Sequence, residues 1–416
     1  MKNRKKYIAI VTSFMGIKGG YFHVARVLID QLSKNFDKIY LINTQNLRFF
    51  PKFARSIYME EDLGENDLKP SEDIPKNFIP FNPKNIKEFS DFLQDKEILI
   101  INNYNKHFFD FPIQMIVKKL KLQQVQISYS GRAMSGSTQK MSLNHILKTV
   151  VFFLNQSFFK KVTVLLSNLG ITPKLDIRFM SDKEVYDSII KDKFKNFLFK
   201  KKLLWAKEIK LVNSMAYDLM LENRYTTSED YIVHLDASLN NRHEIELRGK
   251  WPKEKVVKHY YYLEKFLKKL SKEFNKEVIV TIHPGYNLEE HQSYLKDFKV
   301  LKYKTSEYIY KAFLVTAFDS SAVTEAVLLK KRLLGINSDY MSANEIEHAK
   351  VNPKRFGYPC LNTQKDYNFN MVELLQILNK SISNYDKYIN RYHCHTPNEY
   401  GTKEIIQTIK TKFFIN

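Results

Sequence analysis

The sequence predicts an α/β protein of two domains, each built on a parallel sheet with helices on both faces. Short apolar runs alternate with amphipathic stretches along both halves of the chain, which is typical of buried parallel strands joined by helices. A chain of 416 residues exceeds the size of one ordinary core and suits two domains. Its apolar fraction of 44% is enough to fill two cores, so we expect a globular protein.

In the first half, apolar runs bounded by polar residues indicate strands, and the stretches between them indicate helices. The expected strands are 7–14, 38–43, 97–103, 124–130 and 208–214, and the expected helices lie near 20–34 and 111–121. The stretch from 48 to 95 is rich in proline and charge, so we expect loops and short helices there.

The second half repeats the alternation after the polar stretch 222–230, which we take as the domain boundary. The expected strands are 231–238, 277–282, 299–303, 313–321 and 332–338, and the expected helices are 252–274, 305–312, one that ends at Lys331, and 370–382. The predicted domains are therefore 1–225 and 226–385. A C-terminal tail, 386–416, is expected to pack back on the first domain.

Residues 139–203 mix apolar and cationic residues and form a predicted basic, amphipathic insert of the first domain. The longest uncharged run in its first part, 149–159, is too short to cross a bilayer, but such a composition suits a helix that lies in the membrane interface. The basic run 191–202 favours the same contact with anionic lipid. The alternative is a helix buried between the domains.

The chain carries 66 Lys and Arg against 45 acidic residues, a net charge of +21, so its surface attracts polyanions. Nucleic acid, anionic lipid and phosphorylated ligands all fit this charge. No run of about 18 uncharged apolar residues occurs, and the basic first residues lead into a predicted strand instead of a cleavage site. We therefore expect a cytoplasmic protein that associates peripherally with the inner membrane.

Polar residues follow three strands of the second half. Asp236 ends one predicted strand, His283 follows the next, and Ser320 with Ser321 follows a third. Ligands of parallel sheets bind beyond the carboxyl ends of the strands. Imidazole titrates near neutral pH, and serine hydroxyls before a helix cap amides or bind phosphate oxygens. We interpreted His234 as structural, on the opposite side of its strand from Asp236.

The stretches YIVHLDASLNN (231–241), VIVTIHPGYN (278–287) and FLVTAFDSSAVTEAVLLKK (313–331) resemble bacterial GT-B glycosyltransferases that use CMP-activated acidic sugars. That group includes sialyltransferases and β-Kdo transferases, and it is marked by an HP element and a paired-serine element. The resemblance covers roughly 228–345. It implies a GT-B-like fold, with two Rossmann-like domains facing each other across a cleft.

The resemblance also implies roles for single residues. His283, Ser320 and Ser321 would hold the CMP phosphate, and Asp236 would match the strand-end acid of the β-Kdo enzymes. Asp236 and His283 are the predicted catalytic residues, with Asp236 as nucleophile in a retaining path or base in an inverting one. The predicted donor-binding residues are His283, Pro284, Gly285, Ser320, Ser321 and Glu325, the last for ribose hydroxyls.

Glycines follow the first predicted strand of the chain. Gly19 and Gly20 let the backbone approach an acceptor closely, and His23 lies one turn into the helix, so these three are the predicted acceptor-side residues. The spacing matches neither the dinucleotide-binding fingerprint nor a phosphate loop, so readings based on NAD or ATP lose support. We expect no metal and no cofactor beyond the CMP-sugar donor.

The predicted function is transfer of an acidic sugar, sialic-acid-like or Kdo-like, from a CMP-sugar to a bacterial surface glycan such as lipooligosaccharide, LPS or capsule. The expected partners are the donor, a glycan or glycolipid acceptor and the anionic inner leaflet, without nucleic acid. Two alternatives stay open: a non-catalytic protein that binds polyanions or nucleic acid, and a non-catalytic scaffold of polysaccharide assembly. The sugar, the acceptor, the linkage and the anomeric outcome are open as well.

Overall fold

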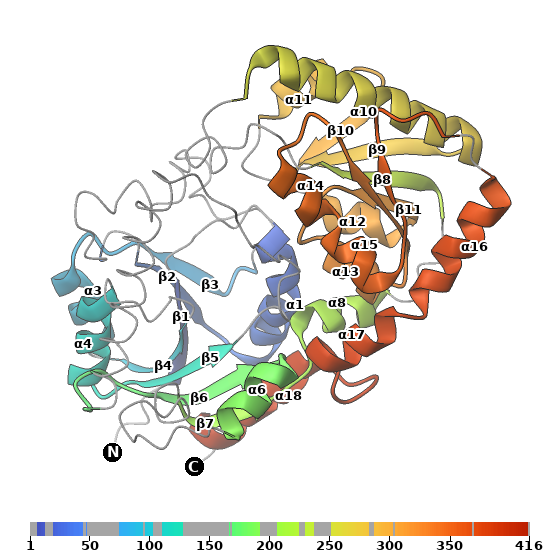
Figure 1. Cartoon of the computed structure of the whole chain (residues 1–416). Coiled ribbons are helices and arrows are strands. Elements are labelled where there is room, and N and C mark those ends of the chain that lie inside the picture. Colours follow the sequence, from blue (N-terminus) through green and yellow to red (C-terminus); the bar gives the residue numbers. More distant parts are fainter. Residues whose placement is uncertain are drawn as a thin grey trace.

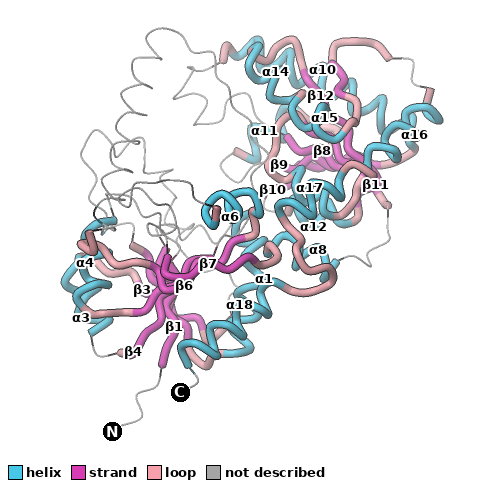
Figure 2. The backbone as a smooth tube through the Cα atoms, turned by 60° about the horizontal axis from the view of Figure 1, so that its bottom comes forward, coloured by secondary structure: helices cyan, strands magenta, loops and turns pink. Residues whose placement is uncertain are grey.

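The computed structural model contains two parallel sheets, one in each half of the chain (Figures 1 and 2). It describes residues 6–12, 20–44, 47, 75–94, 96–102, 110–127, 166, 169–191, 206–223, 229–236, 251–282, 287–302, 304–367 and 370–414. Within these ranges, the side chains of Lys6, Thr12, residues 20–25 and Asn344 are not described.

The N-terminal sheet has seven parallel strands in the order β3-β2-β1-β4-β5-β6-β7. The strands are β1 (Lys6–Thr12), β2 (Ile39–Asn43), β3 (Phe78–Phe81), β4 (Glu97–Asn102), β5 (Gln123–Ile127), β6 (Leu175–Met180) and β7 (Ala206–Leu211). The helices between and after them are α1 (Gly20–Asn35), α3 (Ile86–Gln94), α4 (Phe111–Lys119), α6 (Lys183–Ile190) and α8 (Met215–Asn223). Starting from β1, the chain builds one side of the sheet and then crosses to the other, as in doubly wound folds.

Alternate residues of β1 point to opposite faces of this sheet, and each face has its own core. Ile8 and Ile10 pack with α1 on one face. Ala9 and Val11 pack with α3 and α4 on the other. Because both faces are covered, the strands are apolar on both sides, which explains why the sequence shows them as continuous apolar runs.

The C-terminal sheet has six parallel strands in the order β10-β9-β8-β11-β12-β13. The strands are β8 (Tyr231–Asp236), β9 (Glu277–Ile282), β10 (Lys299–Lys302), β11 (Ala312–Ala317), β12 (Arg332–Asn337) and β13 (Cys360–Asn362). The helices are α10 (Lys253–Phe274), α11 (Leu288–Tyr294), α12 (Thr305–Tyr310), α13 (Val323–Leu328), α14 (Ala343–Ala349), α15 (Val351–Phe356), α16 (Met371–Ile382) and α17 (Tyr385–Tyr392).

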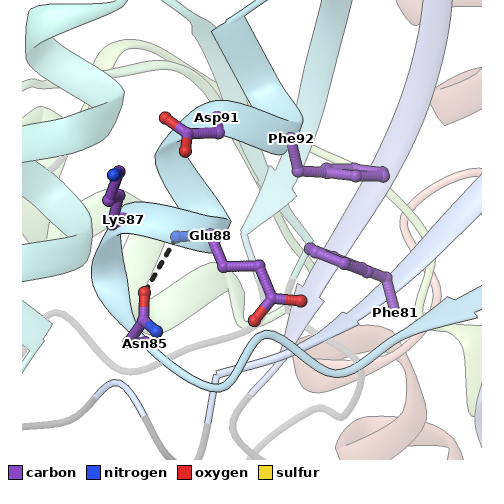
Figure 3. Close-up of a pocket in the computed structure, with 6 residues that line it drawn as sticks. All are labelled: Phe81, Asn85, Lys87, Glu88, Asp91 and Phe92. Atoms are coloured by element: carbon purple, nitrogen blue, oxygen red, sulfur yellow. Dashed lines mark hydrogen bonds between the residues drawn. The ribbon is translucent and has the colours of Figure 1, made fainter.

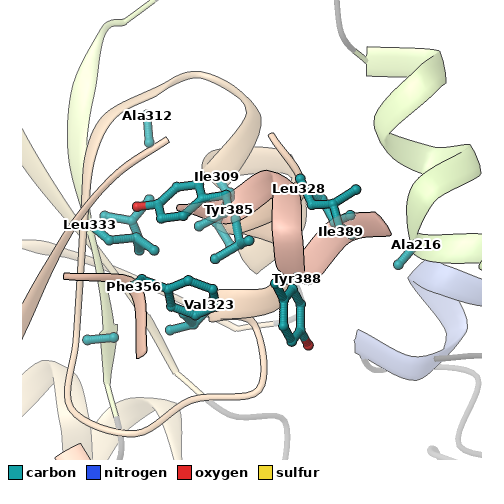
Figure 4. Close-up of a cluster of buried hydrophobic side chains, with 14 of the residues drawn as sticks. Ala216, Ile309, Ala312, Val323, Leu328, Leu333, Phe356, Tyr385, Tyr388 and Ile389 are labelled. Carbon is teal, nitrogen blue, oxygen red and sulfur yellow. The ribbon is translucent and has the colours of Figure 1, made fainter. Parts of the chain in front are cut away.

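The second sheet also has two covered faces. The apolar stripe of α10, which includes Tyr260, Leu263 and Leu267, packs on one face together with residues of α16. The other face carries α12, α13 and α17 around Phe356, Tyr385 and Tyr388 (Figure 4). The 22-residue α10 ends at Asn275, whose positive φ of 52° closes the helix in the left-handed region.

Helix α8 joins the two cores. Its first residue, Met215, belongs to the core of the N-terminal sheet, and Ala216 belongs to that of the C-terminal sheet. The chain crosses back at its other end, where α18 (Gly401–Ile409) and the short π-helix η5 (Lys410–Phe414) pack beside α1 in the N-terminal core. Figure 1 shows α1, α8 and α17 where the two halves meet.

The prediction of two domains built on parallel sheets is confirmed, but two segments differ from expectation. The stretch 48–95 was expected to hold only loops and short helices, yet it contributes the edge strand β3 and the helix α3. Strand β6 and helix α6 lie inside the range predicted as an insert. That part of the range belongs to the sheet, because β6 pairs with both β5 and β7.

Candidate functional site

The candidate site lies where the winding of the C-terminal sheet reverses. From β8 the chain moves outward through β9 and β10, and it then returns to β11 on the other side of β8. Connections that leave two neighbouring strands in opposite directions open a crevice at the carboxyl ends of those strands. Asp236 is the last residue of β8, and Asp319, Ser320 and Ser321 follow β11 directly. The structure thus brings the predicted acid and the predicted serines to the same edge.

Asp236 is buried under this edge. Its side chain is fully shielded from solvent, and Tyr260 of α10 donates a hydrogen bond from its hydroxyl to the Oδ2 atom of Asp236 at 2.9 Å. His291 of α11 places its Nε2 atom 3.4 Å from the same oxygen. The carboxylate therefore faces the two helices that cover the sheet.

His234 lies on the same face as Asp236, so its predicted position on the opposite side of the strand is wrong. The His234 Nε2 atom is 3.7 Å from Asp236 Oδ1, because residues two apart in a strand point to the same face. The Nδ1 atom of His234 is hydrogen-bonded to the hydroxyl of Thr316 on β11 at 3.0 Å. His234 thus connects the ends of β8 and β11.

A third histidine, His259 of α10, completes this cluster. Its ring is fully buried, packs against Phe318 and Tyr260, and has no hydrogen-bond partner for either nitrogen among the described residues. Burial lowers the pKa of His259 to about 4, against the opposing effect of Asp236. Burial by itself raises the pKa of Asp236, but the neighbouring imidazoles outweigh it and hold that pKa below its ordinary value. The cluster therefore contains a carboxylate anion and, at neutral pH, an uncharged His259.

The two serines differ in exposure. The Ser320 hydroxyl accepts a hydrogen bond from the amide of Ala322 at 3.3 Å, as expected for a residue at the start of a helical turn. Ser321 is exposed. Asp319, the residue before them, lies 3.6 Å from Nδ1 of His348 on α14. The side chain of Ser321 is thus accessible to a ligand. Asp319 lies two residues before it in the chain, and His348 lies beside Asp319.

Glu325 lies in the first turn of α13, where one of its carboxyl oxygens is buried. The Oε2 atom has no hydrogen-bond partner among the described residues. Burial raises the pKa of Glu325 to about 7, with Ser306 of α12 acting in the opposite direction. Tyr310 of α12 interacts electrostatically with Glu325 and also with Glu222 of α8. The Glu325 carboxylate accepts a hydrogen bond from a hydroxyl, and the protonated carboxyl can also donate one.

Comparison with known proteins gives information on the fold alone. No protein-family model matches the chain, and no curated protein matches it. The wall teichoic acid polymerase TagF has a similar solved structure, with a TM-score of 0.52, 9% identity, and coverage of 98% of this chain and 89% of TagF. A histidine-to-asparagine variant of TagF soaked with CDPG gives a TM-score of 0.51 at 10% identity, with 98% and 88% covered. This chain has the GT-B fold.

A weaker match is the UDP-GlcNAc 2-epimerase from Methanocaldococcus jannaschii, with a TM-score of 0.47, 11% identity, and coverage of 98% of this chain and 100% of the epimerase. The predicted GT-B-like class is thus confirmed by TagF and by the two sheets. The candidate site occupies the C-terminal one of the two GT-B domains.

Several predicted site residues cannot be placed. His283, Pro284, Gly285 and Gly19 lie outside the described residues. Gly20 begins α1 and His23 lies in its second turn, but their side chains are not described.

Sequence reasoning missed four residues that the GT-B architecture brings to the site: Tyr260, His259, His291 and His348. Tyr260 lies in the apolar stripe of α10, and His259 stands next to it in the sequence. His291 and His348 lie on short helices that the sequence pattern did not reveal. The available signal for His259 was its spacing, three residues after Val256 and four before Leu263, which places it in the apolar stripe of α10.

A pocket of about 410 Å³ lies elsewhere, in the N-terminal domain between β3 and α3 (Figure 3). The rings of Phe81 and Phe92 stack at its wall with centroids 4.0 Å apart. The polar residues beside them serve the helix start, since Glu88 donates its amide hydrogen to Asn85 and accepts one from the amide of Lys84. This pocket belongs to a different domain from the candidate site.

The described residues were also considered as metal ligands and as membrane-spanning helices. In the part of the chain that the structure describes, no three His, Cys, Asp or Glu side chains are arranged to hold a metal ion. Over the same residues, no helix is both long and apolar enough to cross a bilayer. Most of the predicted membrane-facing insert, 139–203, lies outside the described ranges.

Proposed function

We propose that the protein is a glycosyltransferase that moves an acidic sugar from a CMP-sugar donor to a bacterial surface glycan. The proposal depends on one observation. Asp319, Ser320 and Ser321 lie at the same edge of the C-terminal sheet as the end of β8, at the point where the winding of the sheet reverses. GT-B neighbours support the transferase class, and the soak of TagF with CDPG gives a precedent for CDPG on this fold. The acidic sugar rests on the resemblance of the strand-end sequences.

In the proposed reaction, the bond between the anomeric carbon and the phosphate oxygen breaks, and CMP leaves with the bonding electrons. An oxygen of the acceptor hydroxyl bonds to the anomeric carbon, and its proton passes to a base. The transition state resembles an oxocarbenium ion, so stabilisation of the leaving phosphate dominates the rate. We assign phosphate binding to the hydroxyls of Ser320 and Ser321. Ribose binding by Glu325 is kept on sequence grounds, and it requires the buried Oε2 atom to become accessible when the donor binds.

His348 extends the proposed phosphate site. Its Nδ1 atom faces Asp319, and its Nε2 atom has no partner among the described residues. A ring N–H at this position can donate a hydrogen bond to an oxygen of a departing phosphate. His283 follows Ile282, which is the register partner of Asp236. On the basis of its position in the sequence, we assign His283 as a further phosphate ligand.

The role of Asp236 follows from its burial. A nucleophile or a general base must reach the reacting atoms, whereas this carboxylate is enclosed by Tyr260, His234 and His291. We assign it a positioning role, in which it fixes the end of β8 relative to α10 and α11. Replacement of Asp236 by asparagine distinguishes the roles. A nucleophile would lose nearly all turnover with unchanged CMP affinity, whereas a positioning residue loses CMP affinity as well.

The binding step can be tested by thermal unfolding with CMP, UDP, GDP and an oligonucleotide. A ligand that binds only the native state raises the unfolding temperature, so CMP is expected to stabilise the protein and the others are not. The variant Ser321→Ala should lose most of this shift, because it removes the exposed hydroxyl. Ser383→Ala, which removes an exposed hydroxyl at the end of α16, is the matched control and should keep it.

Stabilisation by the oligonucleotide and not by CMP would instead support the polyanion-binding alternative. No stabilisation by any nucleotide would leave the GT-B fold in place but remove the proposed donor.

A further inference from the structure

Helix α10 carries a patch of aromatic, apolar and basic side chains on the N-terminal half of its outer face. The patch consists of Lys253, Lys255, Val257, Lys258 and Tyr261, and the partly buried Trp251 precedes the helix beside it. Tyr261 is 61% exposed and Val257 is 45% exposed, and they lie one turn apart on the face that points away from the sheet. Figure 1 shows α10 along the outer side of the C-terminal half.

The aromatic residues beside the patch are held in place. The ammonium group of Lys255 lies 5.0 Å from the ring centroid of Trp251. Beside the patch, the rings of Tyr262 and Tyr340 stack with centroids 5.9 Å apart. Aromatic rings that carry a polar group, together with lysines whose aliphatic chains extend outward, are typical of protein surfaces at a membrane–water interface.

The patch has an excess of positive charge. Lys258 pairs with Glu254 at 2.6 Å, which leaves the charges of Lys253 and Lys255 without an acidic partner in the described structure. The whole of α10 contains seven lysines and three glutamates, and its net positive charge complements an anionic surface. Because the patch lies on a convex helix face, it suits a broad surface better than a single polymer chain, which needs a groove.

The patch is also close to the candidate site. Tyr260 bonds to Asp236, so residue 260 of α10 stands level with the carboxyl end of β8. Residues 253–259 precede it and extend about 10 Å further, toward the side on which a ligand would enter. A surface that contacts this patch would therefore lie beside the edge that carries Ser320 and Ser321.

We infer that the patch on α10 is a docking surface for an anionic lipid bilayer. Val257 and Tyr261 enter the interface between headgroups and acyl chains, and Lys253, Lys255 and Lys258 contact the anionic headgroups. This surface is separate from the sequence segment 139–203. The inference does not depend on the proposed function, because docking is measured without any substrate.

The direct test places an environment-sensitive fluorophore on the patch of the full chain. Tyr261→Cys is labelled in a Cys360→Ser background, and Lys387→Cys on α17 is the reference, since α17 covers the opposite face of the same sheet. The probes are vesicles of phosphatidylcholine, vesicles that also contain phosphatidylglycerol, and alginate as an acidic polysaccharide. We expect a blue shift of the emission at position 261 with the phosphatidylglycerol vesicles only, and no shift at 387.

A second measurement uses co-sedimentation with the same vesicles. The triple variant Lys253→Gln, Lys255→Gln, Lys258→Gln is expected to bind the anionic vesicles at least about tenfold more weakly. A control that replaces Lys354, Lys380 and Lys387 by glutamine removes the same charge from exposed positions on α15–α17 and should change binding by less than about twofold.

Three results would overturn the inference. The first is an unshifted label at 261 in the presence of anionic vesicles, whether or not the protein sediments with them. The second is an equal shift at 261 and 387. The third is a shift with alginate and not with vesicles, which would assign the patch to an acidic polymer.

Discussion

At the scale of single residues, the main feature is a carboxylate enclosed by aromatic and imidazole rings. An isolated charge in such a place is costly, so Asp236 requires partners that offset its lost hydration. Tyr260 supplies a hydrogen bond, and His291 and His234 lie within 4 Å of the two oxygens. The arrangement fixes the end of β8 and thereby the edge where the proposed donor would bind.

Removal of the Tyr260 hydroxyl tests this support. Tyr260→Phe keeps the stack on Tyr294, whose ring centroid is 4.8 Å away, but takes a hydrogen bond from a buried carboxylate. We expect the free energy of unfolding to fall by about 1–3 kcal/mol in denaturant titrations. The neighbouring Tyr261→Phe is the matched control, and its exposed hydroxyl should contribute almost nothing. Equal effects of the two substitutions would show that Tyr260 does not support Asp236.

His259 gives a prediction for pH. Its pKa is about 4 in the folded protein and near 6.5 in an unfolded chain, so the unfolded state binds the proton more readily. Stability from this group is complete above pH 6.5 and decreases as the pH falls toward 4, by on the order of 3 kcal/mol. Asp236 and His234 are the titratable neighbours that act on the ring.

The check is chemical unfolding of the wild type and of His259→Leu at a series of pH values between 7 and about 4. The unfolding free energy of the wild type should fall relative to that of His259→Leu as the pH falls. A constant difference would mean that His259 does not titrate as a buried neutral group. His393, with a pKa lowered by burial to about 3, acts in the same direction in both proteins and cancels in the comparison.

Residue types near strand ends were predictable, but side-chain directions were not. The positions of Asp236 and the serines follow from the ends of β8 and β11, which the apolar runs locate closely. The enclosure of Asp236 depends on Tyr260 and His291, which come from other parts of the chain. A single sequence does not show which helix covers which strand, so Asp236 was expected to face a ligand.

At the scale of elements, the junction between α8 and α18 ties the two domains together. Asp218 of α8 accepts hydrogen bonds from the amides of Gly401 and Thr402 at 2.8 and 2.7 Å, and another from the Thr402 hydroxyl. The side chain of Asn213 donates to the carbonyl oxygens of Thr396 and Glu399. The bonds to Asp218 satisfy the first amides of α18, which have no helical partner, and the bonds from Asn213 hold the turn before that helix.

Gly401 is required for this close approach. A Cβ atom at position 401 would lie 2.1 Å from the carbonyl oxygen of Asn213, which is a backbone atom and cannot rotate away. We expect Gly401→Ala to lower the free energy of unfolding by about 1–3 kcal/mol or more. Gln407→Ala, at an exposed position on the same helix, is the control. Thermal unfolding of both variants measures the effect, and an unchanged stability of Gly401→Ala would contradict this packing.

Long elements were predictable and short ones were not. The stripe of apolar residues in α10 and the continuous runs of β1, β4 and β9 carry a strong periodic signal. Strand β3 is only FIPF, and Pro80 within it is tolerated because β3 is an edge strand. Strand β6 reads LDIRFM, where Asp176 and Arg178 interrupt the apolar run that marks a buried strand. Both strands were therefore missed.

At the scale of the whole molecule, the two sheets have the same winding from their first strand outward. Each places its reversal point between the first and the fourth strand, β1 with β4 and β8 with β11. The similarity to TagF over 98% of this chain shows that both halves contribute to one fold. The proposed donor site uses the second reversal point, and Gly19, Gly20 and His23 remain the predicted acceptor-side residues.

The claim that ties these scales together is that the second reversal point handles a CMP-sugar. The most direct measurement is release of CMP from a panel of CMP-sugars, with UDP-sugars for comparison, by the wild type, by Ser320→Ala with Ser321→Ala, and by Ser383→Ala. We predict release from at least one acidic CMP-sugar, a loss of at least about tenfold in the double variant, and a normal rate in Ser383→Ala. Release that is equal in all three proteins, or absent for every CMP-sugar, would contradict the account.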